Sequence, residues 1–144
     1  MHHRTTIMRG VDVYRLPPRT DNRGTLYPLE LGNPLPFPLA RVFLIKDCPT
    51  DAVRASHAGT AHQALVAVTG SVTADIDNGH ERETLQLHDA SRVLHLSPGV
   101  WVRLRDFSAD MVLLVASSQL FADVRHFSSP QVHLLEESLA VAHS

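Results

Sequence analysis

Histidine stands out first among the residue types that can do chemistry, with ten copies in 144 residues. His57 and His62 lie five positions apart, with Gly59 between them and no carboxylate before Gly70. A catalytic metal usually takes about three protein ligands or more, and this stretch offers only two. The sequence therefore predicts no bound metal and no cofactor. It leaves His57 and His62 as candidates for catalytic proton transfer, because the pKa of imidazole lies nearest neutrality.

His95 is a third candidate for proton transfer. It alternates with Leu94 and Leu96, so its side chain projects from the opposite face of a predicted strand. The sequence leaves open whether that face lines an interior or meets solvent. Five further histidines fall in turns or polar stretches, and we expect them at the solvated surface: His80, His88, His126, His133 and His143.

Three arginines suggest a site for an anion. Arg23 sits in a turn, Arg41 lies in an apolar strand, and Arg54 shortly precedes His57. The planar guanidinium group matches phosphate and carboxylate, so an arginine inside an apolar strand predicts an acidic partner. That partner is either a bound anion or an Asp or Glu of this chain, and both alternatives stay open.

Gln63 and Trp101 are further candidates for binding a substrate. Gln63 begins a predicted strand, and Trp101, the single tryptophan, follows Pro98-Gly99 at the start of another. The tryptophan either packs in the core or forms a wall of a ligand cavity, which is a common role for aromatic side chains.

Composition narrows the class of protein. Thirteen basic and fifteen acidic residues leave a net charge of −2 without a basic stripe, which argues against binding nucleic acid. The single cysteine, Cys48, permits no internal disulfide and no cysteine-based metal cluster. Neither a signal peptide nor an apolar run of membrane-spanning length is evident, so we expect no membrane partner and a cytoplasmic location.

Short strands separated by turn signals dominate the chain. Segments rich in β-branched and aromatic residues recur about every 8–12 residues, which is typical of a sandwich or barrel. Asn78-Gly79 is a strong hairpin signal, whereas residues 47–59 are expected to form a long polar loop. The clearest predicted strands cover residues 11–14, 40–46, 63–69, 71–77, 82–87, 93–96, 101–104 and 111–116.

The length predicts one domain with two short flanking segments. Residues 1–10 are polar and aperiodic, so we expect a flexible lead-in before a barrel over residues 11–127. Residues 128–144 are expected to form a helical tail, because Ser129-Pro130 precedes a roughly helical apolar stripe.

A D-x-R-G-x-L pattern at residues 21–26 resembles the opening of the sugar-nucleotide 3,4-ketoisomerases, a cupin family also called WxcM-like. The likeness covers most of residues 11–127. It implies an all-β fold, a small cupin-type jelly-roll barrel with a short C-terminal helix. The matching stretches lie, in order, at residues 37–43, 54–57, 63–66, 70–72, 77–79, 98–101, 106–108 and 113–117.

The resemblance also implies a function. Members of this family isomerise dTDP-4-keto-6-deoxyglucose to its 3-keto form without metal, usually as dimers. Arg23, Arg41 and Arg54 would then help to bind the nucleotide diphosphate. His57 would be the first histidine of the family's His-x-His pair, and the protein would be a homodimer.

Three departures from the family pattern leave the activity open. Gly59 replaces the second histidine, Leu44 stands where a tyrosine is common, and Val102 replaces a histidine after the tryptophan. One hypothesis is a deoxysugar isomerase that uses His57, helped by His62 or His95. A second is a barrel reassigned to cyclise or isomerise a less polar natural-product intermediate, because leucine and valine would make the lumen more apolar. A third is a binding module without catalysis.

Overall fold

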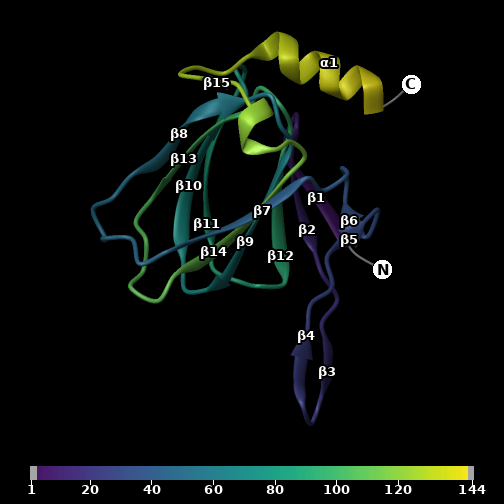
Figure 1. The fold of residues 1–144 in the computed structure, drawn as a ribbon, viewed down its shortest axis with the longest axis vertical. Helices are drawn as coiled ribbons and strands as arrows, with labels where there is room; N and C mark the ends of the chain where they lie inside the picture. The colour runs from purple at the N-terminus through teal and green to yellow at the C-terminus, as the bar shows by residue number, and fades with distance from the viewer. Residues whose placement is uncertain (1–2, 143–144) are drawn as a thin grey trace.

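Two antiparallel sheets face each other and form a small barrel (Figure 1). The structure is a computed structural model that describes residues 3–142. The six-stranded sheet contains, in spatial order, β1 (His3–Met8), β2 (Val11–Arg15), β12 (Arg92–Leu96), β9 (Gln63–Thr69), β14 (Val112–Ser117) and β7 (Arg41–Lys46). The five-stranded sheet contains β11 (Arg82–Leu87), β10 (Val72–Asp77), β13 (Trp101–Arg105), β8 (Arg54–Gly59) and β15 (His126–Phe127).

Several smaller elements lie outside the two large sheets. The β3 (Arg19–Asp21) and β4 (Gly24–Leu26) strands form a hairpin that projects away from it (Figure 1). β5 (Glu30–Leu31) and β6 (Pro34–Leu35) form a parallel pair, and a 3-10 helix covers Phe121–Asp123. The predicted C-terminal helix is present as α1 (Val132–Ala142). No helix among residues 3–142 is long and apolar enough to cross a membrane.

The main core fills the space between the sheets. It is made by alternate side chains of each strand, which is the expected pattern where one face of a strand is buried. The buried members include Leu65, Leu94 and Val115 from one sheet and Ile76 and Leu104 from the other.

A second apolar cluster lies on the outer face of the six-stranded sheet. Leu35 and Phe37 cover it, packed over Ala64, Val66 and Val93. Strand β9 is therefore buried on both faces, which explains its continuous apolar run from residue 64 to residue 67.

Two expectations about strands were wrong. Residues 3–8 are not an irregular lead-in, because they pair with β2 over the register His3↔Arg15 to Met8↔Val11. Residues 54–59 are not the end of a loop but strand β8, which lies between β13 and β15. The backbone of this strand is left-handed at Ala55 (φ 66°) and Ser56 (φ 63°), and its pairing with β13 shifts register there. The shift interrupts the alternation of side chains, so the sequence shows no strand pattern at these residues.

Candidate active site

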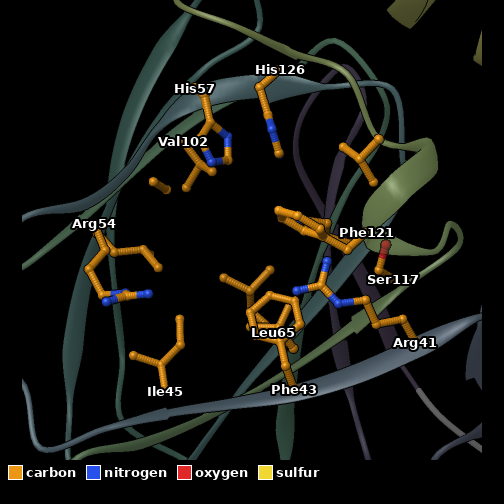
Figure 2. Close-up of a pocket in the computed structure, with 15 residues that line it drawn as sticks. Arg41, Phe43, Ile45, Arg54, His57, Leu65, Val102, Ser117, Phe121 and His126 are labelled. Atoms are coloured by element: carbon orange, nitrogen blue, oxygen red, sulfur yellow. The ribbon is translucent and has the colours of Figure 1, made fainter.

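A cavity of about 210 Å³ opens between the two sheets. Strands β7, β9 and β14 form one wall, where Arg41, Ser117 and Gln63 lie in one cross-strand row. Strands β8 and β13 form the other wall, and the segment from the 3-10 helix to β15 borders the cavity. The floor is apolar and includes Phe43 and Leu65 (Figure 2).

Arg41 and Arg54 bring two positive charges into this cavity from opposite sides (Figure 2). The Arg41 guanidinium lies over two aromatic rings, 4.3 Å from the centroid of Phe43 and 5.1 Å from that of Phe121. Among residues 3–142, no carboxylate lies within ion-pair distance of either guanidinium. Of the two partners left open by the sequence, this favours a bound anion over an acidic residue of the chain.

His57 faces the same cavity from β8 and has a second imidazole beside it. The ring centroids of His57 and His126 are 4.2 Å apart, and the two rings are tilted by 40°. Burial lowers the pKa of His57, and the charge of His126 lowers it further. His57 is therefore neutral near pH 7 and able to accept a proton.

His126 and Ser117 are cavity residues that the sequence did not indicate. His126 is exposed, as expected, but it also borders the cavity, because the two-residue strand β15 pairs with β8. Residues 126–127 are too short to show a strand pattern, so only the tertiary pairing identifies this position. Ser117 could have been found from the alternation of β14, which places it on the same face as Val115.

His62 and His95 do not line the cavity, which corrects their assignment to proton transfer in the lumen. Leu94 and Leu96 point into the core, so His95 points to the outer face of the sheet and is buried in the second cluster. There His62 Nδ1 lies 3.0 Å from His95 Nε2, and the ring of Phe37 stacks on His62 with centroids 5.4 Å apart. Burial and the neighbouring His95 lower the pKa of His62 to about 4.

Arg23 and Trp101, both expected to contact the substrate, lie away from the cavity. Arg23 is on the projecting hairpin, with 87% of its side chain exposed, and pairs with Asp21 at 2.6 Å. Because Val102 points into the lumen, its neighbour Trp101 points out of the five-stranded sheet, where the Arg103 guanidinium lies 5.7 Å from its ring.

Of the two apolar replacements, only one changes the cavity. Val102 lines it, whereas Leu44 alternates with Phe43 on β7 and is 60% exposed on the outer face. Among residues 3–142, no group of three or more His, Cys, Asp or Glu side chains is arranged to hold a metal ion.

The facing antiparallel sheets and the cavity between them define a cupin-type barrel. The chain belongs to the family described as FdtA, WxcM-like, C-terminal, which it matches over residues 9–132. The resemblance found in the sequence is therefore confirmed.

Proteins of named activity are similar to this chain in sequence, and two of them in structure. A TDP-4-oxo-6-deoxy-alpha-D-glucose-3,4-oxoisomerase from Aneurinibacillus thermoaerophilus is 32% identical over 102 residues, 70% of this chain and 73% of that protein. A sugar 3,4-ketoisomerase from Thermoanaerobacterium thermosaccharolyticum, solved in complex with TDP, is 27% identical with a TM-score of 0.78, covering 94% and 98% of the two chains. A TDP-quinovose 3,4-ketoisomerase from Campylobacter jejuni is 28% identical with a TM-score of 0.77, covering 79% and 88%.

Proposed function

We propose that this protein is a metal-independent isomerase that converts a dTDP-4-keto-6-deoxyhexose to its 3-keto form. One observation carries the proposal. The cavity combines two guanidinium groups that have no carboxylate partner with a neutral imidazole, that of His57. A nucleotide diphosphate would supply the missing negative charge, and the imidazole would supply the base. Membership of a family whose relatives are 3,4-ketoisomerases supports both assignments.

Arg41 and Arg54 are the proposed ligands of the diphosphate. Arg41 is held by Phe43 and Phe121, so its guanidinium loses little freedom when it binds an anion. Gln63 lies in the same cross-strand row as Arg41, and its amide is the proposed neutral contact to the substrate. Together these groups would hold the hexose beside His57.

His57 is the proposed catalytic base. The reaction moves a hydrogen from C3 of the hexose to C4, and a second from the C3 hydroxyl to the C4 carbonyl oxygen, through an enediol. His57 would take the proton from C3 and return it to C4 on the same face of the ring. General acid–base catalysis of this kind contributes about 10²–10⁴-fold in rate.

The decisive experiment follows the purified protein and dTDP-4-keto-6-deoxyglucose in D₂O by NMR. The expected result is conversion to the 3-keto isomer, with exchange of the transferred proton. His57→Asn should lower turnover about 10²–10⁴-fold and leave TDP affinity near the parental value. Bound TDP without conversion or exchange would instead indicate a binding module.

The alternative of a less polar substrate has weaker support. It rested on Leu44 and Val102 making the lumen more apolar, and Leu44 points out of the barrel. Val102 and Phe43 still give the cavity an apolar side chain on each of its two walls. A thermal shift with a neutral polyketide-like ligand, and none with TDP, would favour this alternative.

We also propose that the protein is a cytoplasmic homodimer. Three apolar side chains on the outer face of the sheet near its edge strand β7 are exposed: Val42 (50%), Leu44 (60%) and Val68 (44%). Contiguous apolar surface of this kind marks protein interfaces. A second copy of this chain is the proposed partner, because the family resemblance stated for the sequence implies a dimer. The single Cys48 supports the proposed compartment, because intracellular proteins rarely use disulfides.

A further inference from the structure

We propose that His126 is a second acid–base group of the active site and that it takes the place of a side chain missing from β8 at Gly59. This inference rests on the proposed isomerase function and assigns it a further catalytic residue. It would explain how a barrel with one histidine on β8 moves protons on both carbon and oxygen.

The register of two strands places His126 at this position. β15 pairs with β8 so that His126 lies opposite Gly59. Residues 57 and 59 share a strand face, because side chains alternate along a strand. His57, Gly59 and His126 accordingly line one small cleft that adjoins the main cavity. The imidazole of His126 reaches the cavity from the neighbouring strand.

The ring of His126 borders the space above Gly59. A Cβ built at Gly59 would lie 3.7 Å from Cδ2 of His126, which is ordinary van der Waals contact. The other nearest atoms are Cγ1 of Val124 and the carbonyl oxygen of Arg125, both at 3.6 Å. A side chain at residue 59 would therefore begin beside the ring of His126, so the two positions offer a group to the same volume.

In the described part of the chain, the charged groups that face the pair are two cations. Cationic groups of Arg41 and Arg54 line the same cavity. Among residues 3–142, no carboxylate lies within ion-pair distance of either His57 or His126. Burial and the charge of His126 lower the pKa of His57, which suits His57 to accept a proton. The proposed role of His126 is to begin the cycle in its protonated form.

This division of roles balances the reaction. His57 takes the proton from C3 while protonated His126 gives a proton to the C4 carbonyl oxygen, and the enediol forms. His126 then takes the proton of the C3 hydroxyl, and His57 returns its proton to C4. Each histidine ends in the state in which it began, and no oxidant or reductant is needed.

The first test compares His126→Ala and His126→Gln with the exposed-residue control His133→Ala on α1. Both changes at His126 should lower kcat by about 10²-fold, the lower end of the general acid–base range, with KM changed less than about threefold. The control should retain parental kcat. TDP affinity and melting temperature report whether each variant is folded.

A rescue variant separates a chemical role from a structural one. The double variant Gly59→His, His126→Ala should have a kcat at least about tenfold higher than that of His126→Ala. Residue 59 faces the same volume as His126, and its backbone is not left-handed, so a histidine fits there without strain. In the ligand-free protein, His126→Ala should also raise the pKa of His57 in an NMR titration, since the neighbouring positive charge is removed.

The outcomes are distinct. A parent protein that neither converts nor exchanges the substrate removes the proposed function, and the role of His126 falls with it. An active parent whose His126→Ala and His126→Gln variants keep kcat within about twofold overturns only the role of His126. An unchanged pKa of His57 in His126→Ala overturns the coupling of the two imidazoles, whatever the substrate.

Discussion

Among single residues, two guanidinium groups give the lining of the cavity a positive charge. Arg41 and Arg54 face an opening whose floor is apolar, and neither has a carboxylate partner among residues 3–142. Arg41 is half-buried and Arg54 is exposed, so each guanidinium can be reached by a ligand, and a diphosphate would offer both of them charged hydrogen-bond acceptors. Both arginines should therefore contribute to affinity more than to folding.

Replacing either arginine should weaken nucleotide binding. Arg41→Met or Arg54→Met is expected to cost about 2 kcal/mol of TDP binding, roughly thirtyfold in Kd, because a charged hydrogen bond is lost. Isothermal titration calorimetry measures this change. Arg15→Met, at an exposed position on β2, is the matched control and should bind TDP normally. Unaltered affinity in both cavity variants would remove the diphosphate from the proposed site.

At the scale of elements, helix α1 closes one end of the barrel through contacts with tight turns. Leu135 is fully buried in the main core. The turn at Gly99 approaches the helix so closely that a Cβ there would lie 2.3 Å from the carbonyl oxygen of Gln131 and 2.9 Å from the amide nitrogen of Leu135. Both contacts are with backbone, so the helix itself would have to move.

Gly99→Ala should loosen this closure. Gly99 has φ of 85°, and Gly32, with φ of 78°, has nothing within 4 Å of its built Cβ. Gly32→Ala is therefore the matched control, because it adds only the strain of a left-handed alanine. That strain should lower the free energy of unfolding by about 1–2 kcal/mol. Gly99→Ala should cost about 2 kcal/mol more in the free energy of unfolding, because overpacking is added to strain. Equal losses in urea unfolding would contradict the close contact with the helix.

The pair of His62 and His95 joins three other elements. It lies under Phe37, and Nε2 of His62 is 3.3 Å from Oγ of Ser138 on α1. The pair therefore connects the segment after β6, the six-stranded sheet and the C-terminal helix. The contacts of these two rings hold the three elements together, which gives both histidines a structural role outside the cavity.

Stability should fall as this pair is forced to take up a proton. The pKa of His62 is lowered from 6.5 to about 4 in the folded chain, so the unfolded chain binds more protons between these values. Stability contributed by the neutral ring is then present above pH 6.5 and is lost as the pH falls toward 4. From pH 7 to pH 5 the free energy of unfolding should drop by about 2 kcal/mol more in the parent than in His62→Gln. An equal drop in urea titrations of both proteins would contradict this assignment.

At the scale of the whole molecule, an outer apolar face adjoins the wall of the active site. The same strand β7 carries Arg41 and Phe43 toward the cavity and Val42 and Leu44 toward the outside. A homodimer formed on this face would cover the edge strand, whose unpaired backbone groups otherwise invite association. It would also stiffen the strand that holds the proposed diphosphate ligand.

Leu44→Lys should therefore convert the proposed dimer to a monomer. A buried lysine in an apolar interface has no partner, so the dissociation constant should rise by at least about 10²-fold. Sedimentation velocity at several protein concentrations measures it. Val53→Lys is the matched control, because Val53 is exposed to a similar degree, 57%, and lies in the loop between β7 and β8 and not on a strand of the sheet. A parent that sediments as a monomer at every concentration would contradict the proposed dimer.

Much of the architecture was predictable from local pattern. Alternation in β10 and β14, the apolar run of β9 and the turns between them indicated an antiparallel barrel, because strand geometry forces a two-residue period. Residue chemistry alone singled out Arg41 and Arg54 as candidate anion ligands, and it left an acidic partner within the chain open. Local pattern missed β8, since a shifted register and polar side chains hide its period.

Which face of each strand meets the cavity was decided only by tertiary structure. Alternation in the sequence separates His95 from Leu94, but the pairing of β12 with β9 and β2 determines that His95 lies outside the lumen. His126 and Gly59 are 67 positions apart in the chain and meet because β15 pairs with β8. The residue pattern predicted a barrel, two candidate arginine ligands at residues 41 and 54, and a candidate base at residue 57. Long-range strand pairing, which no local pattern encodes, placed His126 beside His57 and set which faces of the sheets carry His62, His95 and Trp101.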